Sequence, residues 1–262
     1  FIRLNINTTF FIKMRILTLL ILILTFQLNS AYAERVKPTF KQSFAVTDIT
    51  GDNIGGPADV TLSPDGTKIH FTNFTNEAGF AFLRQFTLTT PFDISTIDTS
   101  SEVRLNLDGG SDDVGTFVQG HTFNNDGTKV FVIQQSGKLN IHTLTTPYDI
   151  SETSQEADDG VNYRTAFSAG DGDVRSRDIE FNNDGTKMYF VDGGDDTAGD
   201  GGVVEYDLST PFVPSTATFV NELVVTDKLS RFEQDLEFDD DGTRLYIIDS
   251  GNTPQSLSLI HI

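Results

Sequence analysis

The chain has no cysteine and no tryptophan among its 262 residues, and its basic side chains are few. Without cysteine it has neither disulfide bonds nor thiolate chemistry, so stability must come from packing or from bound ions. The 18 lysines and arginines face 38 aspartates and glutamates, which gives a net charge of −20. Such a surface repels nucleic acid and anionic lipid and attracts cations and basic partners. We therefore expect no nucleic-acid partner, and we attribute the bulk charge to solubility or to salty surroundings.

Long apolar runs are also scarce, and the first of them predicts export. Lys13 and Arg15 flank the apolar stretch Ile16–Phe26, and Ala31 and Ala33 occupy the small-residue positions of a signal-peptidase site. Eleven residues are too few to span the roughly 30 Å hydrocarbon core of a bilayer. We expect residues 1–33 to hold an upstream segment and a signal peptide cut after Ala33. The mature chain would then be exported to the periplasm, the cell surface or the medium, without membrane insertion.

A ten-residue motif occurs four times and predicts hairpins. It reads "LSPDGTKIHF" from Leu62, "FNNDGTKVFV" from Phe123, "FNNDGTKMYF" from Phe181 and "FDDDGTRLYI" from Phe238. The glycine of each Asp-Gly pair can adopt the left-handed conformation that closes a hairpin. We expect one strand before and one after each tip, with large residues four positions from the glycine packing between sheets.

A second motif accompanies the first and sets the period. "FTLTTPFDIS", "HTLTTPYDIS" and "YDLSTPFVPS" begin at Phe86, His142 and Tyr206, and each predicts a strand that ends at proline. Successive tip glycines lie 61, 58 and 57 residues apart. A period of this size, filled by short strands, is typical of propeller blades. We predict an all-β protein, a β-propeller of four-stranded blades, with about three and a half to four blades in residues 34–256.

The ends of the predicted propeller are less regular. The outer strands of two blades are expected at Ser101–Leu107 and Thr218–Val225, and Phe40–Asp48 is expected to be an outer strand as well. The last blade is expected to stop after two strands, so we interpret the repeats as incomplete. Residues 257–262 could form the next strand of this blade, and they are otherwise an uncertain tail.

The repeats resemble a known family. The "PDGTK" turn followed by β-formers is similar to YVTN-type and related bacterial propellers of the WD40-like superfamily, and "LTTPYDIS" is similar to a repeat of exported bacterial members. The resemblance covers roughly Phe40 to Ser250 and implies the fold but no function, because propellers host enzymes, lectin-like binders and scaffolds. The missing tryptophan excludes the Asp-box of sialidases, the Trp-Asp of WD repeats and the docking motifs of quinoprotein dehydrogenases. No G-x-S-x-G, phosphate-binding loop or H-E-x-x-H motif is present.

Three carboxylates recur at one position of the repeat. Seven residues before the tip glycines stand Asp59, Gly120, Asp178 and Asp235. They mark the starts of the inner strands and are expected at one mouth of the central channel. Two interpretations stay open: a ring that holds a metal ion, as in metal-dependent propeller hydrolases, or caps of the local loops. His121 begins an inner strand nearby, whereas His70 and His142 fall within strands and are expected to pack.

A second candidate site lies in acidic, glycine-rich loops on the opposite rim from the tips. Hard oxygen ligands at short spacing suit calcium, although no complete calcium-loop motif is present. The candidate ligands are Asp171, Asp173, Asp192, Asp195, Asp196 and Asp200. A solvated loop without an ordered ion is the alternative.

Two functions are open at this stage. The first is a non-catalytic exported propeller that binds a protein, glycan or surface partner through its acidic loops and that calcium stabilises. The second is a metal-dependent hydrolase of the lactonase or esterase type. An enzyme needs convergent groups with perturbed pKa values, so a glutamate or histidine that joins Asp59, Asp178 and Asp235 would favour catalysis.

Overall fold

In a computed structural model of the chain, the described residues are 57–73, 82–107, 118–156, 163, 176–193, 202–224, 233–239, 244–249 and 256–261. The chain divides into two compact units, residues 1–42 and 43–262, and every described residue belongs to the second. Within this described part, no helix has the length and apolar composition needed to cross a bilayer. The expected export signal and the expected outer strand Phe40–Asp48 lie outside the described residues.

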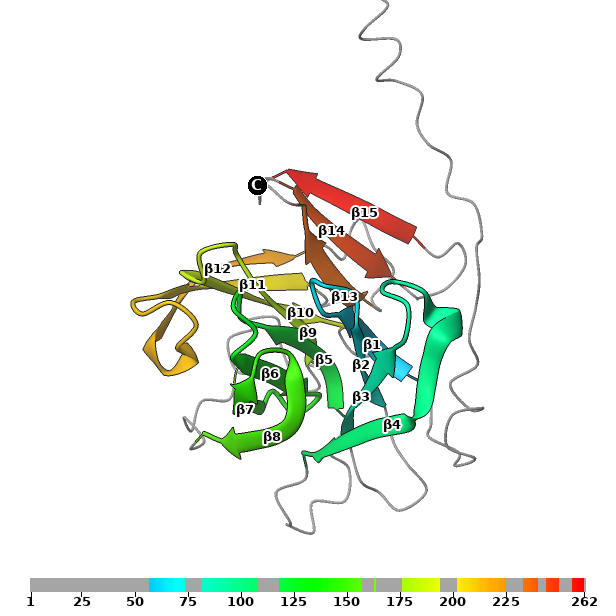
Figure 1. Cartoon of the computed structure of the whole chain (residues 1–262). Helices are drawn as coiled ribbons and strands as arrows, with labels where there is room; N and C mark the ends of the chain where they lie inside the picture. Colours follow the sequence, from blue (N-terminus) through cyan, green and yellow to red (C-terminus); the bar gives the residue numbers. More distant parts are fainter. Residues whose placement is uncertain are drawn as a thin grey trace, which may run out of the picture. The chain divides into compact units, whose positions relative to one another are not determined.

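The described residues form four antiparallel sheets in chain order (Figure 1). The first is β1 (Pro57–Leu62), β2 (Lys68–Asn73), β3 (Phe82–Leu88) and β4 (Ile97–Asn106). The second is β5 (Val118–Phe123), β6 (Lys129–Gln134), β7 (Leu139–Thr146) and β8 (Asp149–Gln155). The third is β9 (Ser176–Phe181), β10 (Lys187–Asp192), β11 (Gly202–Leu208) and β12 (Ala217–Val224), and the fourth is β13 (Glu233–Phe238), β14 (Arg244–Asp249) and β15 (Ser256–His261). Short 3₁₀ turns, η1 (Ile94–Thr96) and η3 (Pro214–Thr216), precede β4 and β12. The prediction of an all-β propeller with four-stranded blades is confirmed.

One expectation about the end of the chain is wrong. The last sheet has three strands rather than two, because β15 pairs with β14 from Arg244↔His261 to Asp249↔Ser256. Residues 257–261, which the sequence left uncertain, therefore belong to β15.

Each of the three described hairpin tips is closed by its own Asp-Gly-Thr sequence. In three tips the aspartate Oδ1 accepts the backbone N–H of the threonine two residues on, at 3.0 Å. The tip glycines Gly66, Gly127 and Gly185 have φ of 68°, 68° and 69°, a conformation that costs other residues steric strain. The tip is thus a local structure that the sequence can specify without help from the rest of the fold.

In the three described tips, an aromatic residue of the second motif covers the tip glycine and forms what we call its aromatic lid. These aromatic residues, Phe92, Tyr148 and Phe212, donate their backbone N–H to the carbonyl oxygen of the tip glycine at 2.9, 2.8 and 3.0 Å. A Cβ added to the glycine would lie 2.4, 2.2 and 2.2 Å from the aromatic ring. The two motifs therefore recur together because they form one structural unit, in which the ring needs the space that glycine leaves.

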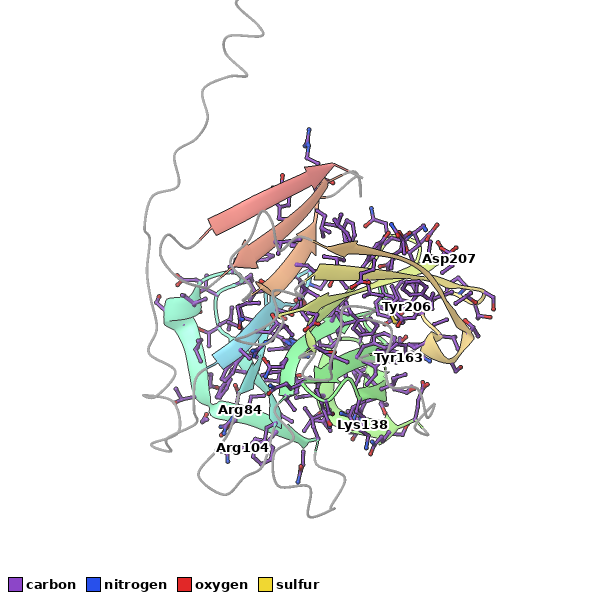
Figure 2. All side chains as sticks on the ribbon, turned by 180° about the vertical axis from the view of Figure 1, so that it is seen from behind. Arg84, Arg104, Lys138, Tyr163, Tyr206 and Asp207 are labelled. Atoms are coloured by element: carbon purple, nitrogen blue, oxygen red, sulfur yellow. The ribbon has the colours of Figure 1, made fainter. Side chains whose placement is uncertain are left out.

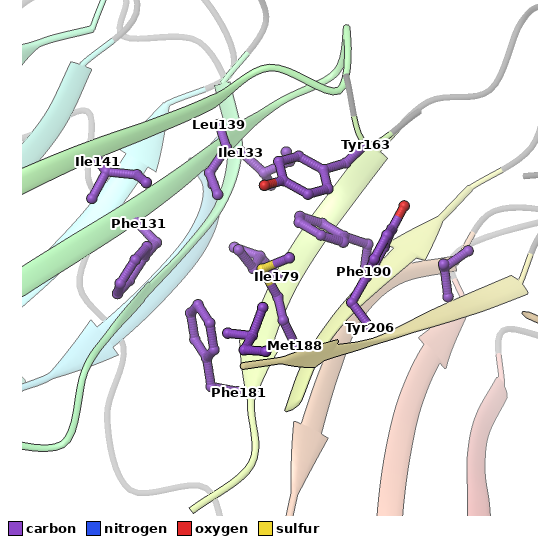
Figure 3. Close-up of a cluster of buried hydrophobic side chains, with 12 residues drawn as sticks. Phe131, Ile133, Leu139, Ile141, Tyr163, Ile179, Phe181, Met188, Phe190 and Tyr206 are labelled. Carbon is purple, nitrogen blue, oxygen red and sulfur yellow. The ribbon is translucent and has the colours of Figure 1, made fainter. Parts of the chain in front are cut away.

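Consecutive sheets pack face to face by a repeating rule. The residues four and six positions after a tip glycine contact the inner strand of the next sheet. Phe131 and Ile133 thus join Ile179 and Phe181 in one buried cluster, with the two phenylalanine ring centroids 4.7 Å apart (Figure 3). The same rule brings His70 to Phe123 and Tyr189 to Phe238, each pair at 4.8 Å. β1 contacts β5, β5 contacts β9, and β9 contacts β13, so the innermost strands are neighbours.

Tyr163 extends the cluster between the second and third sheets. It is fully buried, its ring stacks on Phe190 at 4.8 Å, and it meets Tyr206 edge-on at 5.6 Å. Figure 2 labels Tyr163, which lies in the chain between β8 and β9, and Tyr206 of β11 near one another. Burial raises the pKa of Tyr206 to about 12, so this ring stays neutral.

The two outermost sheet faces differ from the inner ones. Leu62 was expected to pack between sheets as its equivalents do, but it is exposed, and Val60 on the same strand is 62% exposed. Ile248 on β14 is 47% exposed, whereas its equivalent Ile133 is fully buried. Among the described strands, no sheet comes before the sheet of β1 or after the sheet of β14. No described sheet therefore packs on these two faces.

Candidate functional site

The four innermost strands are irregular at the same point. The pairing of each innermost strand with its neighbour shifts register just before or at the position of the recurrent carboxylate. Such bulges bend a strand and change the direction of the next side chain. They turn the position held by Asp59, Gly120, Asp178 and Asp235 toward one place.

The three predicted carboxylates line one cavity of about 280 Å³. Its volume is near the lower end of the roughly 300–1,000 Å³ range of small-molecule sites. The side chains come from β1, β5, β9 and β13, so the cavity lies where the innermost strands meet. The lining residues are Asp59, Val60, Thr61, Leu62, His121, Thr122, Asp178, Glu180, Asp235, Leu236 and Glu237.

Gly120 is the one member of the series without a carboxylate, and the structure explains why. A Cβ on Gly120 would lie 1.9 Å from Asp178 Oδ1 and 2.7 Å from Asp178 Cα. No side chain fits there unless β9 moves. The glycine therefore makes room for the Asp178 carboxyl group.

Two of the aspartates bind backbone N–H groups of the next inner strand. Asp59 Oδ2 accepts the N–H of His121 at 2.7 Å, and Asp178 Oδ2 accepts the N–H of Leu236 at 3.1 Å. Asp59 Oδ1 also accepts the N–H of Val60 at 2.6 Å. This contact is of the loop-capping kind that the sequence offered as the alternative to a metal ring. These carboxylates thus connect successive blades as well as facing the cavity.

Asp59 and His121 form an ion-pair contact. His121 Nδ1 lies 2.7 Å from Asp59 Oδ2, and the histidine side chain is fully buried. Burial by itself would raise the pKa of Asp59. The charge and hydrogen bonds of His121 outweigh burial, and the pKa of Asp59 lies below its ordinary value.

The Asp178 and Asp235 carboxyl groups are in hydrogen-bond contact. Burial, followed by the negative charges of Asp59 and Asp235, raises the pKa of Asp178 well above its ordinary value. Burial also raises the pKa of Asp235. The pair therefore keeps a proton at a pH where isolated aspartates have lost theirs.

Two glutamates were not identified from the sequence. Glu180 and Glu237 stand two residues after Asp178 and Asp235, hence on the same face of β9 and β13. Burial is the main cause that raises the pKa of both, and for Glu180 the charge of Glu237 adds to it. The sequence does contain a signal for these glutamates, because one position of the repeat is always polar. Five residues before each tip glycine stand Thr61, Thr122, Glu180 and Glu237.

The metal ring expected at this cavity stays a prediction. Among the described residues, no group of three or more histidine, aspartate or glutamate side chains converges as metal ligands do. Of the calcium-loop candidates, Asp192 is described: it is buried at the end of β10, opposite Ser176 and Gly202. The other five candidates, Asp171, Asp173, Asp195, Asp196 and Asp200, lie outside the described residues.

The sheets and their packing define the class of the protein, a β-propeller, and comparison with known proteins supports this class. No protein-family model matches the chain, and a search of curated proteins finds no match. Among solved structures, a protein of Bacteroides uniformis described as a candidate 6-phosphogluconolactonase is similar, with a TM-score of 0.50 and 14% identity. The alignment covers 80% of this chain and 54% of that one.

Two further solved structures are less similar. A Bacteroides fragilis protein with the same description has a TM-score of 0.47 and 15% identity, over 85% of this chain and 59% of that one. The periplasmic gluconolactonase of Pseudomonas aeruginosa has a TM-score of 0.46 and 14% identity, over 79% and 55%. The chain thus spans little more than half the length of these proteins. At this level of identity the likeness shows the fold alone.

Proposed function

We propose that the protein is an exported propeller hydrolase that cleaves an ester or lactone bond in the acidic cavity. The observation that carries the proposal is the hydrogen-bonded pair Asp178–Asp235 in a cavity of about 280 Å³. The sequence left a partner-binding propeller and a hydrolase open. His121, Glu180 and Glu237 now join the three aspartates, and this convergence favours the hydrolase.

The carboxyl pair can both accept and donate a proton. Two carboxylates in hydrogen-bond contact cannot both be charged without a large repulsive energy, so the pair holds one proton. Asp178 is the more buried partner and keeps this proton, while Asp235 is more exposed to the cavity and has an acceptor oxygen. Groups whose environments separate their pKa values commonly act as the acid and the base of one reaction.

Hydrolysis then needs two proton transfers. Asp235 takes a proton from a water molecule, whose oxygen forms a bond to the carbonyl carbon of the substrate. The carbon–oxygen bond to the leaving group breaks, and the leaving oxygen receives the Asp178 proton. Positioned acid–base groups of this kind contribute about 10²–10⁴-fold to a rate. In this proposal every step falls to a side chain, since no three described side chains are arranged as metal ligands.

Asp59 and His121 adjust the pair without transferring the proton themselves. The negative charge of Asp59 raises the pKa of both Asp178 and Asp235. His121 in turn keeps Asp59 charged. Asp59 is therefore a positioning and tuning residue for the carboxyl pair.

Export and family are parts of the same proposal. Lys13, Arg15 and the apolar stretch Ile16–Phe26 support an exported protein, and the "DGTK" and "LTTPYDIS" repeats support a YVTN-type propeller. The similarity in fold to a candidate 6-phosphogluconolactonase is compatible with ring opening of a lactone.

The test is an assay of neutral esters and lactones with the full chain and two variants. Asp178→Asn keeps the size of the side chain but cannot deliver a proton, so we expect kcat/KM to fall about 10²–10⁴-fold. Asp207→Asn, an exposed aspartate on β11, is the matched control and should leave the rate unchanged. Wild-type protein that hydrolyses none of the substrates, or an Asp178→Asn variant as active as wild type, would contradict the proposal.

A further inference from the structure

The contact between the first and second sheets, which we call the first junction, differs in chemistry from the two that follow it. Four residues after the tip glycines stand His70, Phe131 and Tyr189, and six residues after them stand Thr72, Ile133 and Val191. All six side chains are buried. The later junctions thus have aromatic and aliphatic side chains where the first junction has a histidine and a threonine.

The hydrogen bonds of His70 show which of its nitrogens carries the proton. Nε2 lies 3.0 Å from the carbonyl oxygen of Tyr148, between β7 and β8, and 3.2 Å from Oε1 of Gln85. Both oxygens are acceptors, so Nε2 donates, and the neutral ring has its free acceptor on Nδ1. Nδ1 is buried without a hydrogen-bond partner among the described residues. A second proton there would place a charge and an unsatisfied N–H between the sheets, which is costly.

The charged groups near His70 do not offset this cost. Lys68, on the same strand, bonds to Asp149 across the first junction at 3.0 Å. His121 of β5 is also a neighbour of His70 and is paired with Asp59. Burial lowers the pKa of His70 to about 4, and His121 and Lys68 make smaller contributions in the same direction.

His142 is a second buried histidine at the first junction. It lies opposite Val130 on the sheet face that packs against the first sheet, where Val130 shares a buried cluster with Leu83 of β3. His142 is 4% exposed, and neither of its ring nitrogens has a hydrogen-bond partner among the described residues. Its charged neighbour Glu156 is paired with Lys129 at 2.6 Å. Burial lowers the pKa of His142, although the charge of Glu156 acts in the opposite direction.

We propose that the first junction is an acid-sensitive joint, which opens when His70 and His142 take up protons while the other described junctions stay closed. Two cavities border this joint. One is the acidic cavity, whose walls include Asp59–Leu62 of β1 and His121 of β5. The other, of about 250 Å³, lies between the first tip and residues 147–148. Opening separates the walls of both cavities, and this inference does not depend on the proposed hydrolase.

The sign and the pH range of the effect follow from proton linkage. A histidine with a depressed pKa in the closed joint contributes stability that is present above its ordinary pKa and is lost as the pH falls toward the lower value. For His70 this range runs from 6.5 to about 4. Between pH 7.5 and pH 5, protonation of the open form should therefore favour opening at least about tenfold. His142 adds to this effect in the same direction.

Amide hydrogen exchange measures opening at a chosen junction. The N–H of His121 donates to Asp59 across the first junction, and the equivalent N–H of Leu236 donates to Asp178 between the third and fourth sheets. Exchange of both amides is followed by NMR at pH 7.5 and pH 5 and corrected for the intrinsic rate. We expect the protection of His121 to fall at least about tenfold more than that of Leu236. Equal changes at the two amides would overturn the inference, because they would mean that the junctions respond alike.

Substitutions test whether the two histidines cause the opening. His70→Phe and His142→Phe each introduce the phenylalanine that another sheet has at the same position of the repeat, so the ring should fit. Each single variant should show a smaller fall in the protection of His121, and the double variant should show none. Tyr189→Phe, at the position of His70 in the third sheet, is the matched control and should behave as wild type. A double variant that keeps the full fall in protection would overturn the inference.

Discussion

Asp65 and Asp178 show how position alone changes the chemistry of one side chain. Asp65 at an exposed tip accepts hydrogen bonds from Ser63 and Thr67, and these lower its pKa to about 2. Asp178 is almost fully buried, and burial together with neighbouring carboxylates raises its pKa well above the ordinary value. The first aspartate is permanently charged and structural, and the second keeps a proton that can be transferred.

The raised pKa of Asp178 predicts a dependence of stability on pH. A carboxyl group whose pKa is higher in the folded state contributes stability that is fully present below its unfolded pKa. This stability is lost as the pH rises through the folded pKa. Asp178→Asn removes this loss, and its amide can still donate to Asp235 and accept from Leu236. We expect the variant to be more stable than wild type at pH 8 and no more stable at pH 3, measured by urea unfolding. Parallel curves for the two proteins would contradict the assignment of Asp178.

The charge of Asp59 predicts a shift in the pH profile of hydrolysis. Activity needs one proton on the pair Asp178–Asp235, so the rate falls when the pH rises above the upper pKa of the pair. Asp59→Asn removes a negative charge that raises this pKa. We expect the alkaline limb of kcat/KM to move to lower pH. A variant with lower activity and an unmoved alkaline limb would show that Asp59 acts only through structure.

At the scale of elements, similar sequences do not always fold alike. In the first and third sheets, "DIS" and "VPS" of the second motif lead into the turns η1 and η3, and the outer strand follows. In the second sheet the same "DIS" is already the start of β8. There Asp149 binds Lys68 of the first sheet at 3.0 Å, and the N–H of Ile150 donates to Gln85 at 2.9 Å. Contacts with a neighbouring sheet therefore accompany the earlier start of the strand.

The unit formed by a tip and its aromatic lid predicts a large effect of one methyl group. Gly127→Ala places a Cβ 2.2 Å from the Tyr148 ring in a left-handed conformation. The backbone strain costs about 1–2 kcal/mol and the overpacking about 1–3 kcal/mol, so we expect a loss of about 2–5 kcal/mol in the free energy of unfolding. Combining Gly127→Ala with Tyr148→Ala should cost less than the sum of the single changes. Strict additivity would show that the ring does not confine the glycine.

In the whole molecule, packing between sheets decides which residues form the core. Equivalent positions of the repeat have the same residue type but different surroundings. Val191 and Ile133 are fully buried between sheets, while Ile248 is 47% exposed on the last described face. Similarly, Phe181 is buried, but its equivalent Leu62 is exposed on the first described sheet face.

This difference predicts unequal effects of equal substitutions. Ile133→Ala creates a cavity between the second and third sheets and should cost about 2–5 kcal/mol. Ile248→Ala removes a side chain that is about half exposed and should cost less than about 1 kcal/mol. Urea unfolding of the two variants provides the measurement. Equal losses would mean that the face of β14 is covered in solution.

The sequence by itself determined the local structures that repeat. Asp-Gly-Thr fixes a tip because aspartate caps threonine two residues away and glycine adopts positive φ, and both effects act within a few residues. The fixed period then places Asp59, Asp178 and Asp235 at equivalent points, so their meeting in one cavity could be predicted. Only the tertiary structure decided that Gly120 leaves room for Asp178, that Asp178 bonds to Asp235, and that His121 pairs with Asp59. These contacts join residues about 60 positions apart, and they depend on bulges that turn the side chains and on burial that changes their pKa. No local pattern of residues encodes either effect.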